Sequence, residues 1–240
     1  MESTDVLVIG SGIAGLCAAI EAARTGATVT VASAGKTMSG SSFFPGTWGL
    51  GLIGPVNEDD EQDLIDTILA VGGGVADPEL VQAFVHGIPQ AIDWLEQDLG
   101  VELQRPQSAK SAQQKQFIPC FDHKTRMWRG LTRKPLEDAL TTWIESLGIR
   151  LLPRHELIDL VEDTNGRITG TVLYDLTENR IVPLAAKATI IAAGGTGGLF
   201  ERSLTSADVL SSSQAIALAH GASLTNIEFM QMMPGFIEPK

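Results

Sequence analysis

Short continuous apolar runs alternate with amphipathic stretches along the chain, which is typical of buried parallel strands and the helices that cover them. Val6–Ile9 is such a run, and the Ala-rich stretch Ile13–Arg24 after it predicts a helix that Gly26 ends. Ala27–Ala32 then predicts a second strand. These three segments predict a β-α-β unit with parallel strands.

The middle of the chain predicts two helices between two stretches without a period. Glu58–Ala70 predicts one helix, and Asp77-Pro78 marks the start of another, because Asp is a good N-cap and Pro suits the first helical position. The stretches 35–55, rich in Gly and Ser, and 104–132, polar and basic, show no clear period. The expected apolar stripe of the second helix is Leu80, Phe84, Ile88, Ile92, Leu95 and Leu99.

The remaining part of the chain predicts two helices and several short strands. Pro135–Leu147 and Ser211–His220 predict the helices, and Asn165-Gly166 marks a hairpin turn. The whole pattern predicts an α/β fold with a central parallel sheet, crossover helices and a small β-meander. The expected strands are 150–152, 156–162, 168–176, 182–184 and 188–192.

Composition and charge narrow the function classes. The 240 residues are 44% hydrophobic and 19% charged, which is globular, and the net charge of -12 disfavours binding to nucleic acid or an anionic membrane surface. No apolar run is long enough to cross a bilayer. Cys17 and Cys120 form neither a CxxC pair nor a zinc spacing, so we expect no metal and a reducing, cytoplasmic location.

A GxGxxG motif lies at the first predicted strand-to-helix turn. It reads Gly10-Ser11-Gly12-Ile13-Ala14-Gly15, in the context that a dinucleotide site requires. Gly10 is expected to allow the tight turn, Gly12 to let a pyrophosphate approach the backbone, and Gly15 to let helix and strand pack closely. The free N–H groups at the helix start would face the anion. A glycine turn that serves packing alone is the alternative.

The acid that usually follows the second strand is absent. NAD-binding domains place Asp or Glu there to bind the ribose hydroxyls, whereas this chain reads Ser33-Ala34-Gly35. The Ser33 hydroxyl can bond a ribose hydroxyl, but less strongly than a carboxylate. This difference argues against an NAD-binding dehydrogenase, which stays as an alternative.

Several segments resemble the fumarate reductase, succinate dehydrogenase and L-aspartate oxidase flavoprotein family. The resemblance covers most of the chain and implies a Rossmann-like FAD-binding domain of the glutathione-reductase type over residues 1–240. It also implies hydride transfer between flavin N5 and a small substrate, with the protein positioning both. The segments that carry the resemblance are Asp5–Leu16, Gly40–Phe44, Asp66–Gly74 with Asp77, Ala188–Gly195 and Asn226–Pro234.

FAD is the cofactor that this resemblance implies, while the catalytic residues and the electron partner stay unassigned. Ser41 occupies the position of the histidine that binds FAD covalently in respiratory members, so we expect non-covalent FAD. The expected FAD-binding residues are Gly10, Ser11, Gly12, Ile13, Ala14, Gly15, Ser33, Ala34, Gly40, Ser41, Ser42, Phe43, Leu157, Ala193, Gly194 and Gly195.

Three further departures from the family pattern limit the expected activity. Ser211–Ser213 replaces a Gly-Asp-Gly that contacts flavin, and Met233 replaces a substrate-binding histidine. A thioether cannot donate a hydrogen bond to a carboxylate, so dicarboxylate specificity does not follow. The family's capping domain and last FAD segment would come after Lys240, so we expect a truncated, inactive FAD-binding domain. A non-catalytic nucleotide-binding or structural fragment is the other alternative.

Weaker signals receive structural interpretations. Lys124, Arg126 and Arg129 lie near Trp128 and predict a solvated basic loop rather than an anion site. His220 precedes Gly221 at a helix end, where the helix dipole favours a partly charged imidazole, so we expect a capping role. We also expect a structural role for His155. Phe43, Phe44 and Trp48 could stack on flavin or anchor their loop.

Overall fold

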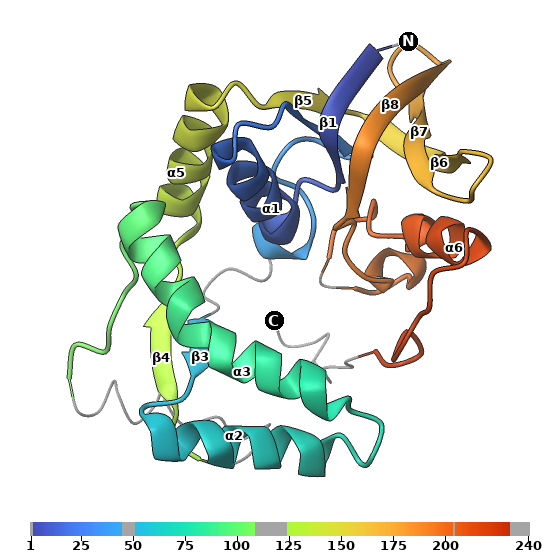
Figure 1. The fold of residues 1–240 in the computed structure, drawn as a ribbon. Coiled ribbons are helices and arrows are strands. Elements are labelled where there is room, and N and C mark those ends of the chain that lie inside the picture. The colour runs from blue at the N-terminus through green and yellow to red at the C-terminus, as the bar shows by residue number, and fades with distance from the viewer. Residues whose placement is uncertain (1, 45–50, 109–123, 204, 231–240) are drawn as a thin grey trace. The chain divides into compact units, whose positions relative to one another are not determined.

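Residues 2–44, 51–108, 124–203 and 205–230 are described by a computed structural model, in which the chain divides into two units (Figure 1). The first unit combines Met1–Thr47 with Ser146–Lys240, and the second is Trp48–Glu145. No helix within the described ranges is long and apolar enough to cross a membrane.

A six-stranded sheet with the order β5-β2-β1-β8-β7-β6 forms the first unit. The β5, β2, β1 and β8 strands run parallel, with β1 between β2 and β8, whereas β8, β7 and β6 form an antiparallel meander. This mostly parallel sheet confirms the predicted α/β fold. The strands are β1 Glu2–Ile9, β2 Val29–Ser33, β5 Arg150–Pro153, β6 His155–Glu162, β7 Ile168–Asp175 and β8 Arg180–Ile191.

The sheet must curl, because β5 and β6 follow each other in the chain but form its two opposite edges. Only Arg154 separates β5 from β6, and its N–H donates to the carbonyl of Gly35 just after β2 (2.9 Å). Leu157 of β6 and Ala32 of β2 therefore share one hydrophobic core with Leu7 of β1. The curl brings the start of β6 to the carboxyl end of β2.

Helix α1, Ile13–Arg24, has the predicted bounds and buries Leu16, Ala19 and Ile20 at helical spacing. Helix α6, Ser212–Ala219, lies near its expected place, and two short 3-10 turns, η1 and η4, occupy Ser41–Phe43 and Gly197–Leu199.

One strand, β8, replaces two predicted ones at 182–184 and 188–192. Its first half pairs with β7 and its second half with β1, and Leu184 pairs with both neighbours. Pro183 and Lys187 interrupt the apolar pattern of the sequence. The backbone of β8 nevertheless stays extended throughout, because each half of the strand pairs with a different neighbouring strand. The prediction of two strands was therefore wrong.

The described residues of the second unit form three α-helices, one π-helical turn and a two-stranded sheet. Asp77 caps α3 as predicted, because its carboxylate accepts from the N–H groups of Glu79 (2.9 Å) and Leu80 (3.3 Å). The short strands β3 and β4 were not predicted. The buried ring of Trp128 fills the space that side chains at Gly51 and Gly130 would occupy, so this sheet requires glycine at both positions. The elements are β3 Gly51–Gly54, α2 Glu58–Val71, α3 Pro78–Asp93, the π-helical turn η3 Trp94–Asp98, β4 Met127–Gly130 and α5 Arg133–Ser146.

The predicted apolar stripe of α3 is wrong at its start. Leu80 and Phe84 are 60% and 63% exposed, whereas Val81 and Val85 are buried together with the later members of the stripe. An α-helix turns by roughly 100° per residue, so a series at steps of four drifts by about 40° at each step. The first two members therefore leave the buried face.

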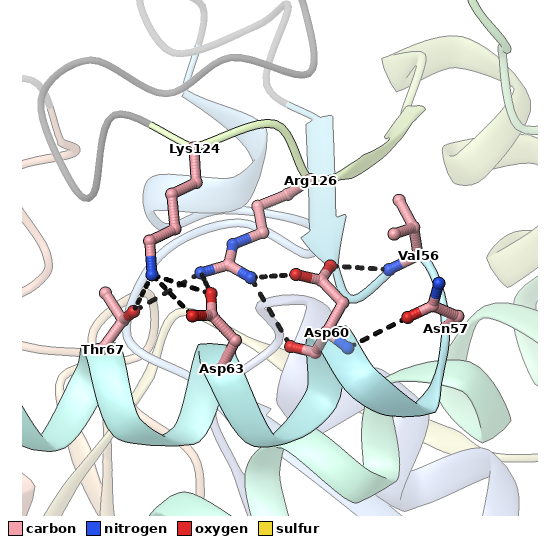
Figure 2. Close-up of polar contacts among 7 residues, drawn as sticks. All are labelled: Val56, Asn57, Asp60, Asp63, Thr67, Lys124 and Arg126. Atoms are coloured by element: carbon pink, nitrogen blue, oxygen red, sulfur yellow. Dashed lines mark hydrogen bonds and ion pairs between the residues drawn. The ribbon is translucent and has the colours of Figure 1, made fainter.

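Arg126 is fully buried, so the prediction of a solvated basic loop was wrong for this residue. Its guanidinium pairs with the carboxylate of Asp60 and, at 2.9 Å, with Asp63 on the next turn of α2 (Figure 2). Lys124 also binds Asp63 at 2.7 Å. The hydrogen bond from Lys124, and then the one from Arg126, place the pKa of the Asp63 carboxyl below its ordinary value. These ion pairs hold the segment before β4 against α2.

His220 occupies the C-cap position of α6, but its ring binds carboxylates of β6 rather than helix carbonyls. Nε2 lies 2.9 Å from Asp159 Oδ1, and Nδ1 contacts Glu162. The hydrogen bond to Asp159, and then the one to Glu162, raises the pKa of His220 above its ordinary value. The His220 imidazole therefore ties α6 to β6, and its protonated form makes the stronger contact.

This contact predicts a stability that falls with rising pH. A histidine whose folded pKa is raised stabilises the fold fully below its unfolded pKa of about 6.5, and the contribution is lost as pH rises through the folded value. We expect the urea-unfolding free energy to decrease above that point, and His220→Gln to flatten the decrease. His86→Gln, at an exposed site on α3, is the control. An unchanged slope in His220→Gln would contradict the contact.

Candidate cofactor site

A cavity of about 240 Å³ opens at the carboxyl ends of β1, β2 and β8, within the first unit. In open α/β sheets, ligands bind outside the carboxyl ends of the strands, where neighbouring connections leave in opposite directions. The lining comes from 9–14, 32–34, 39–42, 155–157, 192–194 and 208–213.

The protein itself requires two glycines of the GxGxxG turn. A side chain at Gly10 would overlap the carbonyl oxygen of Ala192, and Gly10 adopts φ +112°, which side chains disfavour. A side chain at Gly15 would overlap the carbonyl oxygen of Gly10. These glycines let β1, α1 and the end of β8 approach closely.

Gly12 differs, because no contact among the described residues explains it. Within this part of the chain, a Cβ at Gly12 would meet nothing nearer than the carbonyl oxygen of Ser39 at 3.9 Å, and φ is -72°. Gly12 nevertheless lines the cavity. The absent side chain leaves free space beside the start of α1, which is what a closely approaching phosphate needs.

The start of α1 is electrostatically open to an anion. Gly12 is its N-cap, no side chain caps the helix, and the first turn contains no acidic residue. The first N–H groups of a helix have no partner within it, and the helix dipole makes this end positive. A pyrophosphate beside Gly12 would accept hydrogen bonds from these groups.

Two buried polar atoms at the cavity lack partners. Asp208 Oδ1 and Ser211 Oγ have no hydrogen-bond partner among the described residues, and both residues line the cavity. Buried polar groups are usually paired, so a polar ligand would satisfy these atoms. Together with the space at Gly12 and the open start of α1, they show that the residues present fit a dinucleotide.

The cavity brings most of the predicted site residues together. Ser41 lies in the lining with its hydroxyl 2.7 Å from Thr205 Oγ1. Three predicted residues are not in the lining: Gly15 packs beneath Gly10, Phe43 is buried, and Gly195 lies outside. Trp48 is outside the described residues. The predicted residues in the lining are Gly10, Ser11, Gly12, Ile13, Ala14, Ser33, Ala34, Gly40, Ser41, Ser42, Leu157, Ala193 and Gly194.

Sequence reasoning missed Asp208 and the place of His155 in the lining. The expected structural role of His155 agrees with its contacts, because Nδ1 lies 2.9 Å from the Pro153 carbonyl and Nε2 3.6 Å from Asp175 Oδ2. Neither position carries a local signal. Asp208 lies far along the chain from the first turn, and only the missing acid after β2 could have prompted a search for a substitute.

The fold is that of a Rossmann-type domain, and its cavity lies at the start of the first helix. The chain belongs to the family described as FAD binding domain, whose model matches residues 5–239, together with the fumarate reductase and L-aspartate oxidase flavoproteins. FAD is therefore the cofactor, as the resemblance predicted, and this match does not support the NAD-binding and non-catalytic alternatives.

The similar proteins are much longer than this chain. It is 35% identical to an L-aspartate oxidase of Halobacterium salinarum, over 97% of this chain and 45% of that protein. It is 30% identical to the 8-methylmenaquinol:fumarate reductase flavoprotein subunit of Wolinella succinogenes, over 98% of this chain and 38% of that protein. A chain of the solved Mycobacterium smegmatis Sdh1 complex in the apo form matches with a TM-score of 0.78 at 26% identity. The match covers 96% of this chain and 41% of that chain. The chain thus spans less than half the length of these relatives.

Proposed function

We propose that this chain is the cofactor-binding part of a flavin-dependent oxidoreductase that transfers a hydride between FAD and a small organic substrate. Bound FAD would supply the redox chemistry, and the chain would hold and orient it. The free space at Gly12, beside the uncapped start of α1, carries the proposal. We include both units, residues 1–240, because the family match covers 5–239.

Each part of the lining has a proposed task. The N–H groups of Ile13 and Ala14 would bind the pyrophosphate, and the end of β2 with Leu157 would border the adenosine. The loop Gly40–Ser42 and the end of β8 at Ala193-Gly194 would border the flavin half. These groups bind and orient, so the chain alone is not expected to turn over substrate.

The first candidate substrates are L-aspartate and fumarate, the dicarboxylates that appear in the names of the relatives. We also propose a cytoplasmic location. The free thiol of Cys17 supports it, because thiols stay reduced in the cytoplasm, whereas oxidising compartments favour disulfides.

The test begins with FAD uptake by the purified chain, followed by absorbance spectroscopy after removal of free flavin. We expect a flavin spectrum. The native polypeptide that contains this chain is then loaded with FAD and mixed without oxygen with L-aspartate, or reduced and mixed with fumarate. Bleaching or recovery of the flavin band supports the proposed substrates. FAD uptake without either response rejects the dicarboxylates, and no uptake rejects the site.

Acid precipitation is expected to release all bound flavin. Covalent attachment in the family uses a histidine, whereas Ser41 has a hydroxyl that already contacts Thr205. A serine hydroxyl is a poor nucleophile without an adjacent base. Flavin fluorescence should therefore appear in the supernatant and not in the denatured protein band, equally for wild type and Ser41→Ala. A fluorescent protein band would show covalent attachment.

A further inference from the structure

The end of β2 lacks the group that dinucleotide-binding domains use for the ribose. A carboxylate there normally accepts hydrogen bonds from the ribose hydroxyls. Here β2 ends at Ser33, followed by Ala34 and Gly35, and all three offer no charged acceptor. A neutral hydroxyl forms a hydrogen bond of roughly half the strength.

Asp208 brings a carboxylate to this place from a distant part of the chain. A Cβ built on Gly35 would overlap Asp208 Oδ2 and lie 3.0 Å from Asp208 Cγ, so the carboxylate rests against the Gly35 backbone. Two contacts hold the Asp208 segment there. Gly40 N–H donates to Ser206 Oγ (3.2 Å), and the hydroxyls of Ser41 and Thr205 bond at 2.7 Å.

The carboxylate is placed for a ligand rather than for the fold. Asp208 lines the cavity, and its Oδ1 is buried without a hydrogen-bond partner among the described residues. A buried carboxylate oxygen that only stabilised the fold would be paired, because an unpaired one is destabilising. A donor on a ligand that enters the cavity would supply the missing partner.

The chemistry of FAD selects the donor. A carboxylate repels the pyrophosphate, so it must face hydroxyl or amine groups of the nucleotide. With the pyrophosphate at Gly12, the end of β2 borders the adenosine ribose, whose two hydroxyls are donors. We propose that Asp208 accepts hydrogen bonds from the ribose hydroxyls of the FAD adenosine, in place of the absent acid after β2. This inference rests on FAD binding at the cavity.

The test compares the affinities for FAD and for its 2′-deoxyadenosine and 3′-deoxyadenosine analogues by fluorescence titration. Wild type is expected to bind at least one analogue roughly tenfold more weakly than FAD, the usual effect of losing a hydrogen bond to a charged group. Asp208→Ala should bind FAD about as weakly as that analogue and lose the preference. Ser33→Ala is the matched control and should keep most of it.

A second measurement separates a ligand contact from a structural one. Without FAD, the thermal midpoint of Asp208→Ala should equal or exceed that of wild type, because an unpaired buried oxygen is removed. Should this variant not fold, Asp208→Asn provides the same comparison and should show a reduced preference. An unchanged preference in the Asp208 variants, or its loss in Ser33→Ala, would overturn the inference. If wild type binds FAD but shows no preference over the analogues, the inference about Asp208 is overturned and the proposed function stands. If wild type binds no FAD, both are overturned.

Discussion

Replacing Gly12 with valine is expected to weaken FAD binding roughly a hundredfold while leaving the unliganded fold in place. Among the residues that the structure describes, a Cβ at Gly12 meets no atom nearer than 3.9 Å, and φ of -72° suits valine. The fold should therefore lose only about 1 kcal/mol as the N-cap worsens. The side chain would instead fill the space beside the first N–H groups of α1. Loss of two such contacts to a charged phosphate, about 3 kcal/mol, corresponds to roughly hundredfold weaker binding.

Flavin fluorescence titration measures this binding, and thermal denaturation without FAD measures the fold. Gly12→Ala should lie between wild type and Gly12→Val in affinity. Gly10→Ala and Gly15→Ala are the contrasting variants, because their Cβ atoms would overlap backbone oxygens. These two should destabilise the unliganded protein by about 3 kcal/mol or more. Unchanged FAD affinity in Gly12→Val would show that the pyrophosphate does not bind at this position.

Replacing Arg126 with alanine is expected to destabilise the second unit strongly. The guanidinium is fully buried, while Asp60, whose side chain is 15% exposed, has its carboxylate against it. Removing one partner of a buried pair leaves the other charge uncompensated, which typically costs about 3 kcal/mol or more. The Asp60 carboxylate also accepts from Val56 N–H (2.8 Å), so the first turn of α2 should loosen as well.

Urea unfolding followed by circular dichroism measures this loss, and hydrogen exchange in α2 and β4 locates it. Lys124→Met is the control from the same network. Lys124 and Asp63 are 46% and 45% exposed, so water already screens their pair and the effect should be far smaller. Equal unfolding free energies for Arg126→Ala and wild type would show that the pair contributes nothing net.

The sequence by itself determined the features that neighbouring residues encode. The bounds of α1, the cap at Asp77 and the hairpin near Asn165 follow from periodicity, capping and turn chemistry, all of which act within a few residues. The position of the cavity also followed, because the motif in its lining is encoded by consecutive residues.

Only the tertiary structure decided the features that depend on distant partners. Arg126 is buried because it packs against residues of another element, α2. Leu80 is exposed on α3 because its side chain faces away from the buried side of that helix. The same holds for β8, which is one strand because β7 and β1 each pair with one half of it. Asp208 reaches the end of β2 because packing brings its segment against Gly35. Local periodicity and propensity contain no information about such contacts, since they are formed by segments that lie far apart in the chain.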